Sequence, residues 1–368
     1  MLRLLQRSER AISSAPTGAP RARLLAQRVL LLARHWRVGE LPEALSTAQA
    51  AVQAADDRLA VAEFELARGV AMYYGTQTRE AIVPVQQARD AAIALGEAGL
   101  EAECEAWLGC IRGTLHHDPC EVLPHLRQAV RLGGAQRPLA AARALYVVAT
   151  LYQEADLVDE AVRHYRRASG IARAENDEQL VAAVHRYMTL AQAQQVRRAR
   201  AAGRLDGEQL KQALVALGSA QQLAAALTID DTGLQSNLRL GEMLRLSGQY
   251  AQASAVFERT VDPAARAGMT WEATIARADH AVCLAHAGRL DSAVREGDLA
   301  AVEVAPHFDD YSQAVVHDAL AELAGLLGRA RQQARHAQIA RRAWEADAAY
   351  CVALRAALLA QGPFVPAD

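Results

Sequence analysis

The chain has 368 residues, of which 52% are hydrophobic, 5% aromatic and 22% charged. Because so few of the apolar residues are aromatic, much of the apolar share is alanine, the residue with the highest helix propensity, which favours an all-α protein. The formal net charge of −2 and the pI of about 6.6 give no overall basic surface, so we expect no nucleic-acid partner.

The N-terminal 20 residues predict a short amphipathic helix over 2–12 followed by a loop of helix-poor residues. They lack the apolar run of a signal peptide, and no stretch of the chain approaches the roughly 18 apolar residues of a membrane span. The five cysteines form no C-x-x-C pair, which suits free thiols in a reducing compartment. We therefore expect a cytoplasmic protein without a membrane partner.

From Arg21 a pattern begins that recurs eight times. Each copy has a marker residue, usually Ala, at the opening of a predicted second helix, and successive markers lie 37, 41, 39, 52, 40, 40 and 40 residues apart. Seven positions after the marker comes another small residue, Ala in seven copies and Thr in one. A register kept over so many copies indicates stacked helix pairs. The markers are Ala44, Ala81, Val122, Ala161, Ala213, Ala253, Ala293 and Gln333.

The clearest copy is the stretch 237–260, NLRLGEMLRLSGQYAQASAVFERT. It predicts two amphipathic helices separated by a turn at Gly248, where glycine permits the positive φ that ends many helices. The stretch resembles the tetratricopeptide repeat (TPR) family, whose Leu-Gly, Tyr, Ala and Phe signature it matches. The resemblance implies an all-α, right-handed superhelical solenoid of about eight helix pairs that binds other molecules on its concave face. The matching residues are Leu240, Gly241, Tyr250, Ala253 and Phe257.

The period near 40 exceeds the roughly 34 residues of a minimal TPR. It resembles the arrays of bacterial signal-sensing regulators, peptide-pheromone receptors, the sensory halves of some diguanylate cyclases, and kinesin light chains. The output parts of those proteins are missing: the chain has no GG[DE]EF motif and no P-loop, and a DNA-binding domain does not fit before Arg21. A stand-alone adaptor and a fragment of something longer both stay open.

The fifth copy carries about a dozen extra residues around 195–209, from which Arg197, Arg198, Arg200 and Arg204 are expected to project. One interpretation is a lengthened helix pair with a solvated basic end. The other is a protruding basic contact site for an acidic partner or nucleic acid.

These patterns divide the chain into an N-terminal helix and loop (1–20), a TPR-like array (21–345) and a C-terminal capping helix with a tail (346–368). The capping helix is expected because a terminal repeat must cover its outer apolar face. A homodimer formed through the terminal repeats stays open for the same reason.

The densest cluster of ligand-type side chains is His-His-Asp-Pro-Cys at 116–120, which invites a zinc interpretation. However, Asp118 as an N-cap and Pro119 as the first helical residue predict an ordinary turn between helices, and no second Cys/His pair stands at finger spacing. The motifs H-E-x-x-H and G-x-S-x-G are also missing. We therefore expect no metal, no cofactor and no enzymatic activity.

In TPR arrays the first helix of each pair lines the groove, and the resemblance carries this role over by register. Aromatic, Arg and Gln side chains suit an extended peptide, because amides pair with its backbone and arginine with its carboxylates. The alternative for each residue is an exposed helix face, or inter-helix packing for the aromatic ones. The candidates are Trp36, Tyr73, Tyr74, Arg143, Tyr146, Gln153, Glu154, Gln192, Gln195, Glu242, Arg245 and His286, with Asp318 and Glu322 in the last copy.

The sequence thus predicts a non-catalytic scaffold or adaptor that binds a protein or extended peptide in its groove, in bacterial signalling or regulation. The alternative is a sensor in which a peptide or small molecule changes the superhelical pitch, because small rotations add along a repeat array. Such a sensor would control an output partner or domain, such as a diguanylate cyclase or a transcription regulator. A chaperone-binding TPR is disfavoured, because its carboxylate clamp needs lysines and this chain has only Lys211.

Overall fold

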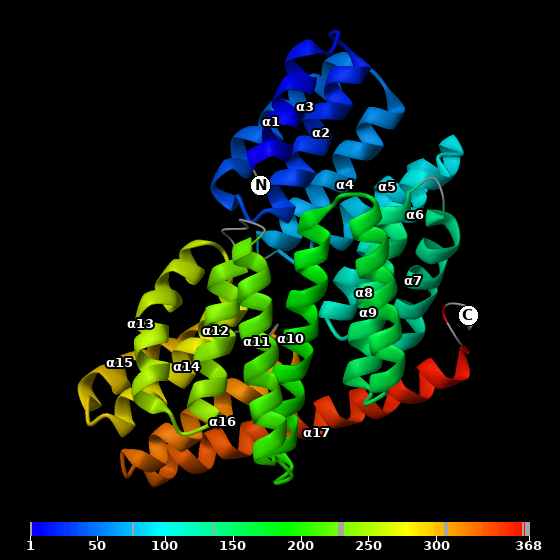
Figure 1. Ribbon diagram of the computed structural model, residues 1–368. Helices are drawn as coiled ribbons and strands as arrows, with labels where there is room; N and C mark the ends of the chain where they lie inside the picture. The colour runs from blue at the N-terminus through cyan, green and yellow to red at the C-terminus, as the bar shows by residue number, and fades with distance from the viewer. Residues whose placement is uncertain are drawn as a thin grey trace. The chain divides into compact units, whose positions relative to one another are not determined.

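The computed structural model describes residues 2–75, 77–134, 137–226, 232–304, 308–362 and 364 (Figure 1). Within these residues every regular element is helical. The chain divides into two compact units. The first unit is Met1–Val184 with Leu354–Asp368, and the second unit is His185–Ala353.

The first unit begins with α1, which confirms the short helix predicted at the N-terminus, and continues with antiparallel helix pairs. Its elements are α1 (Leu2–Ser14), α2 (Ala19–Arg34), the 3₁₀ turn η1 (Val38–Glu40), α3 (Leu41–Ala55), α4 (Arg58–Tyr74), α5 (Ile82–Leu95), α6 (Ala98–Thr114), α7 (Pro119–Gly133), α8 (Pro138–Glu154) and α9 (Val158–Ala174).

The second unit repeats the same arrangement. Two helices, α10 (Glu178–Ala201) and α17 (Ala330–Ala360), contribute residues to both units. The others are α11 (Gly207–Ala226), α12 (Thr232–Leu246), α13 (Tyr250–Arg266), α14 (Thr270–His286), α15 (Leu290–Glu303) and α16 (Asp310–Leu326).

The helices from α2 to α17 form eight consecutive pairs among the described residues. The marker lies in the first turn of the second helix in six copies, whereas Ala81 immediately precedes α5 and Ala213 lies further along α11. The helices of a pair lie side by side, as α4 with α5 and α14 with α15 (Figure 1). First helices also contact first helices of the next pair, as α6 with α8 and α14 with α16. Each unit is therefore an all-α solenoid of TPR-like helix pairs, as predicted.

The small residues of the repeat mark places where paired helices touch. A Cβ added to Gly69 of α4 would lie 2.4 Å from Val85 Cγ2 and 3.0 Å from the backbone oxygen of Ala81. A Cβ on Gly241 of α12 would lie 2.6 Å from the ring of Phe257. Because such distances are shorter than van der Waals contact, glycine lets the second helix pack directly on the backbone of the first.

Among the described residues, the turn inside every pair except α4–α5 contains a residue with left-handed backbone. Gly248, which ends α12, has φ 77°, confirming the turn predicted between α12 and α13. In the fourth copy Asp156 takes the equivalent position with φ 57°, a conformation that Asp tolerates better than most residues. In the first copy the left-handed residue is Trp36, at φ 55°.

Buried apolar clusters hold the helix pairs of the second unit together. One cluster joins α14, α15 and α16 around Val282, Val315 and Leu320, with Trp344 of α17 packed against it. Another joins α10, α11 and α12 through Val196, Leu217 and other residues.

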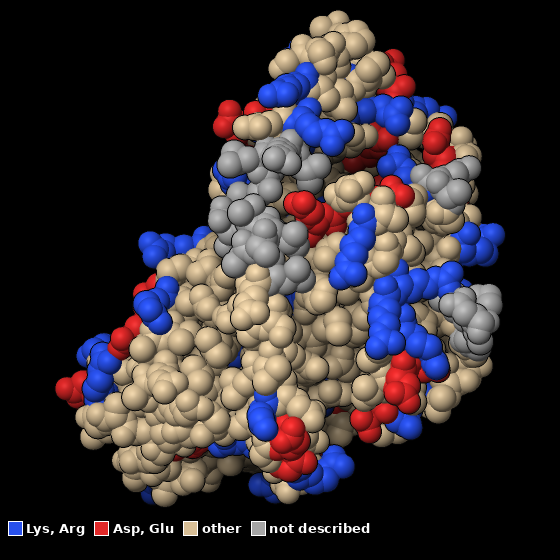
Figure 2. All heavy atoms as spheres, viewed as in Figure 1, with Lys and Arg blue, Asp and Glu red and all other residues tan. Residues whose placement is uncertain are grey.

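Charged side chains of both signs are mixed over the surface in Figure 2, with basic side chains gathered over α9. The exposed arginines of α9 are Arg163, Arg166, Arg167 and Arg173. None of the described helices combines the length and apolar character that crossing a membrane needs. The domain boundaries at 20, 21, 345 and 346 stay a prediction, and residues 365–368 of the predicted tail lie outside the described part of the chain.

Candidate functional site

In the first unit, predicted groove residues meet in an aromatic cluster made of Trp36, Tyr73, Tyr74 and Trp107. The ring centroids of Trp36 and Tyr74 lie 5.0 Å apart, edge to face. Both tyrosines also pack edge-on against Trp107 of α6, with centroids 6.0 and 6.1 Å away. Trp107 is fully buried. The structure therefore brings three of the candidates together as inter-helix packing, around a tryptophan that the prediction did not include.

Arg143 of α8 extends this aromatic cluster. Its guanidinium carbon lies 4.0 Å from the centroid of Trp107, a cation–π arrangement, and the side chain is buried. Tyr146 is buried on the same helix, and Gln153 and Glu154 close that helix about two turns further on.

The aromatic cluster has unused hydrogen-bond donors. Among the described residues, the indole N–H groups of Trp36 and Trp107 are buried and have no hydrogen-bond partner. Trp36 also lies in the turn after α2 rather than on the helix, in a left-handed conformation that is rare for a bulky residue. A buried donor without an acceptor is destabilising, so a ligand carbonyl or a water that reached these groups would be bound favourably.

In the second unit the predicted residues lie in an ion cluster built on the first helices. Arg197 of α10 forms ion pairs with both Glu242 of α12 and Asp279 of α14, and all three side chains are almost fully buried. Arg239 adds a second partner for Glu242, at 2.9 Å.

Arg245 connects this interior to the surface. Its guanidinium lies 3.3 Å from Asp279 and 2.6 Å from Glu322 of α16. Glu322 also pairs with Arg200 at 3.0 Å and faces His286 at 3.8 Å. The candidates Glu242, Arg245 and His286 thus meet in one place, whereas Gln192 and Gln195 lie half-buried further back along α10.

Arginines favour the charged form of the buried Glu242 carboxyl. Burial alone would raise the pKa of Glu242, but Arg197 and Arg239 lower it below its ordinary value. Burial would likewise lower the pKa of Arg197, and Asp279 and Glu242 raise it instead. Arg197 and Glu242 therefore stabilise each other's charged forms in a poorly solvated interior.

The expectation that four arginines project from the fifth copy is wrong for two of them. Arg197 is buried in the ion cluster, and Arg198 makes a bidentate pair with Asp347 of α17 at 2.7 Å on both oxygens. Arg200 and Arg204 are exposed. The extra residues lengthen α10 to 24 residues and α11 to 20, which confirms the lengthened helix pair.

Asp279 was missed by the sequence analysis, although the sequence carries a signal for it. It lies in the run TIARADHAVCLAH on α14, in which nearly all of the remaining residues are buried as well. A carboxylate in such a run needs a partner, because an unpaired charge is strongly disfavoured in an apolar interior. Arginines on other first helices are the candidates for that partner.

The turn at 116–120 is an ordinary helix start. Asp118 accepts a hydrogen bond of 2.8 Å from the backbone N–H of Cys120, and Pro119 opens α7, as predicted. In the described part of the chain, no three His, Cys, Asp or Glu side chains are grouped closely enough to hold a metal ion. The five cysteines are free thiols.

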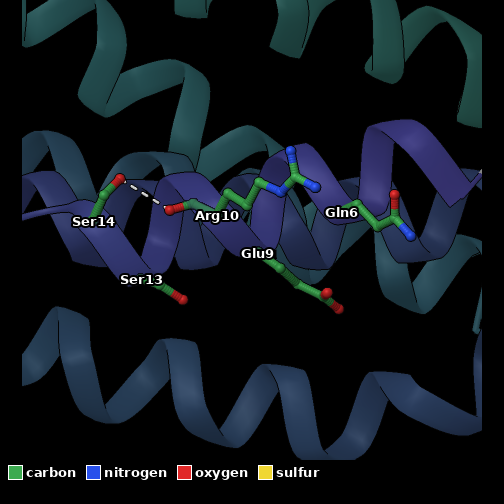
Figure 3. A pocket seen from close by; sticks show the side chains of 5 residues that line it. All are labelled: Gln6, Glu9, Arg10, Ser13 and Ser14. Carbon is green, nitrogen blue, oxygen red and sulfur yellow. Dashed lines mark hydrogen bonds between the residues drawn. The ribbon is translucent and has the colours of Figure 1, made fainter.

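An open depression of about 480 Å³ lies on α1 (Figure 3). Its lining consists of exposed polar side chains, and the Ser14 hydroxyl is already bonded to the backbone oxygen of Arg10 at 2.9 Å. It offers no buried or converging groups. The lining residues are Gln6, Glu9, Arg10, Ser13 and Ser14.

No family model and no curated protein matches this chain. Among solved structures, it is similar to a Rap protein complexed with competence and sporulation factor, with a TM-score of 0.64, 15% identity, and coverage of 95% of this chain and 93% of that one. It is also similar to the Rap conjugation gene regulator of plasmid pLS20 in complex with the Phr* peptide, with a TM-score of 0.59, 15% identity, and coverage of 92% of this chain and 99% of that one. For the apo form of RapI the TM-score is 0.50 and the identity 11%, with coverage of 94% of this chain and 88% of that one.

The chain is similar in fold to the Rap proteins. At these identities the similarity concerns architecture, a TPR-like helical-repeat fold that covers nearly the whole of both chains.

Proposed function

We propose that this chain is a non-catalytic helical-repeat adaptor that binds an extended peptide, either free or as a segment of a protein partner. The observation that carries the proposal is the similarity of almost the whole chain to two Rap structures solved with bound peptides. The proposal extends to a cytoplasmic role in bacterial signalling or regulation, which the description of one neighbour as a conjugation gene regulator supports.

The chemistry of the first helices supports a peptide as the ligand. Trp36, the half-buried member of the aromatic cluster of the first unit, has an indole N–H without a hydrogen-bond partner among the described residues, and a peptide carbonyl is a suitable acceptor for it. The ion cluster of the second unit reaches the surface through Arg200, Glu322 and His286. Peptide recognition commonly combines backbone hydrogen bonds with pockets or charges for particular side chains.

The alternative, a ligand-responsive sensor, is supported by a different observation. Both α10 and α17 contribute residues to the two units. A ligand that shifted either helix would therefore change both units, and through them an output partner.

The test uses the full chain and a random hexapeptide pool. Protein and pool are mixed, the protein is separated by size exclusion, and the retained peptides are identified by mass spectrometry. We expect a few related peptides to be retained and to bind, after resynthesis, with a Kd of about 10 μM or tighter, that is about −7 kcal/mol. Retention of no peptide would overturn the proposal. The sedimentation coefficient then separates the alternatives, because a sensor changes its shape on binding and a rigid scaffold does not.

A further inference from the structure

The ion cluster of the second unit holds more arginines than carboxylates. Among the described residues, four arginines share three carboxylates within ion-pair distance, so the arginines of this cluster exceed its carboxylates by one. An excess charge beside a protein interior attracts a counter-charge strongly, because solvent screens it poorly. The arginines are Arg197, Arg200, Arg239 and Arg245, and the carboxylates are Glu242, Asp279 and Glu322.

The cluster opens to solvent at Glu322. One oxygen of this carboxylate accepts hydrogen bonds from both Arg200 (3.0 Å) and Arg245 (2.6 Å), and the other oxygen faces His286 at 3.8 Å. The Glu322 side chain is 27% exposed, Arg200 43% and His286 30%, whereas Arg245 is only 4% exposed. A partly exposed glutamate thus occupies a position surrounded by cationic or ionisable groups.

Arg245 also has unused donor capacity. Its two terminal nitrogens pair with Asp279 and Glu322, but its Nε is buried and, among the described residues, has no hydrogen-bond partner. His286 is held in place by stacking on Tyr250, with centroids 3.8 Å apart and an interplanar angle of 9°. Both groups are therefore fixed and able to donate to a further acceptor.

We propose that a carboxylate of the bound peptide, from its C-terminus or from an Asp or Glu side chain, binds to Arg200, Arg245 and His286, and that Glu322 occupies this position in the free protein. The inference rests on the proposed peptide-binding function and names the group that the second unit recognises. Arginine pairs well with carboxylates because its planar fork donates two parallel hydrogen bonds. Glu322 is partly exposed on a flexible side chain, so it can turn to water when the peptide arrives.

A peptide cation paired with Glu322 is disfavoured by the same geometry. Glu322 already has two arginine partners, and a further positive charge would add to the excess on the cluster. Like charges brought together at an interface oppose binding.

The experiment divides the hexapeptides into four pools: free or amidated C-terminus, each with or without Asp and Glu. Affinity selection is run on the wild type and on three variants, and retained peptides are titrated individually. We expect the amidated pool without Asp and Glu to be depleted about tenfold relative to the others. The two intermediate pools identify the source of the carboxylate.

The variants test the competition. Glu322→Gln removes the internal carboxylate, so carboxylate peptides should bind about tenfold more tightly, whereas Arg200→Gln should weaken them about tenfold. Arg204→Gln, an exposed arginine on the same segment, should leave the Kd unchanged. Circular dichroism checks that each variant is folded, and the exposed Arg200→Gln remains informative if Glu322→Gln does not fold.

Equal retention of all four pools, or unchanged affinity in Arg200→Gln, would overturn the inference and leave the proposed function intact. Retention of no peptide from any pool would overturn both.

Discussion

Replacing Arg197 by Met tests whether the buried ion cluster stabilises the second unit. Arg197 is 5% exposed and pairs with Glu242 and Asp279, which are 2% and 0% exposed. Breaking a buried ion pair costs about 3–5 kcal/mol, because it leaves a charge without its partner. Here Glu242 keeps Arg239 and Asp279 keeps Arg245. We therefore expect the free energy of unfolding to fall by about 2–4 kcal/mol.

The assay is urea denaturation followed by circular dichroism, with Arg289→Met as the matched control. Arg289 pairs with Glu258 on the surface, where the two side chains are 53% and 43% exposed. An exposed pair of this kind contributes about 0–1 kcal/mol. The reasoning is refuted if Arg197→Met lowers stability no more than Arg289→Met.

The difference in stability between the wild type and Arg197→Met should also depend on pH. The folded-state pKa of Glu242 is lowered from its ordinary 4.5, so its stabilising contribution is complete above pH 4.5 and is lost as the pH falls through the lower folded value. The stability difference between wild type and Arg197→Met should therefore shrink below pH 4.5. A difference that stays constant there would show that the lost stability comes from packing and not from charge.

Three further predictions concern other elements. Gly69→Ala should lower the free energy of unfolding by about 1–3 kcal/mol, because the added Cβ meets Val85. Gly170→Ala on α9, where the added Cβ meets open space, should raise it by about 0.5–1 kcal/mol. Urea denaturation measures both, and a change of the same sign in the two variants would contradict the prediction. Burial lowers the folded-state pKa of His280 from 6.5 to about 4, so the unfolded chain binds this proton first and the free energy of unfolding falls as the pH drops from 6.5 toward 4. His280→Gln should therefore show a smaller drop in urea midpoint over this range than the wild type. An equal drop in the two proteins would contradict this prediction. Asp57→Ala removes the 2.7 Å cap of α4 and should cost about 1 kcal/mol, seen as faster amide exchange in the first turn of α4 but not in its centre.

The sequence by itself determined the repeat architecture. Because each helix pair buries its apolar face only against its neighbours, the spacing of small and apolar residues already carries the information for the fold. Most marker residues lie in the first turn of the second helix, and Gly248 lies in the turn between α12 and α13, as that spacing predicts. The packing glycine Gly241 was part of the same sequence pattern, since close helix approach leaves no room for a side chain.

Tertiary structure alone decided which polar residues meet. Arg197 and Asp279 are 82 positions apart, and no spacing within one repeat relates them. Their partnership depends on the lengthened α10, which brings basic residues beside first helices of later copies, so residues expected to project are buried instead. Trp107 was not predicted for the same reason. In the sequence, a ring buried between helix pairs cannot be told from any other core residue. Only the structure shows that Arg143 and two tyrosines from other helices surround it.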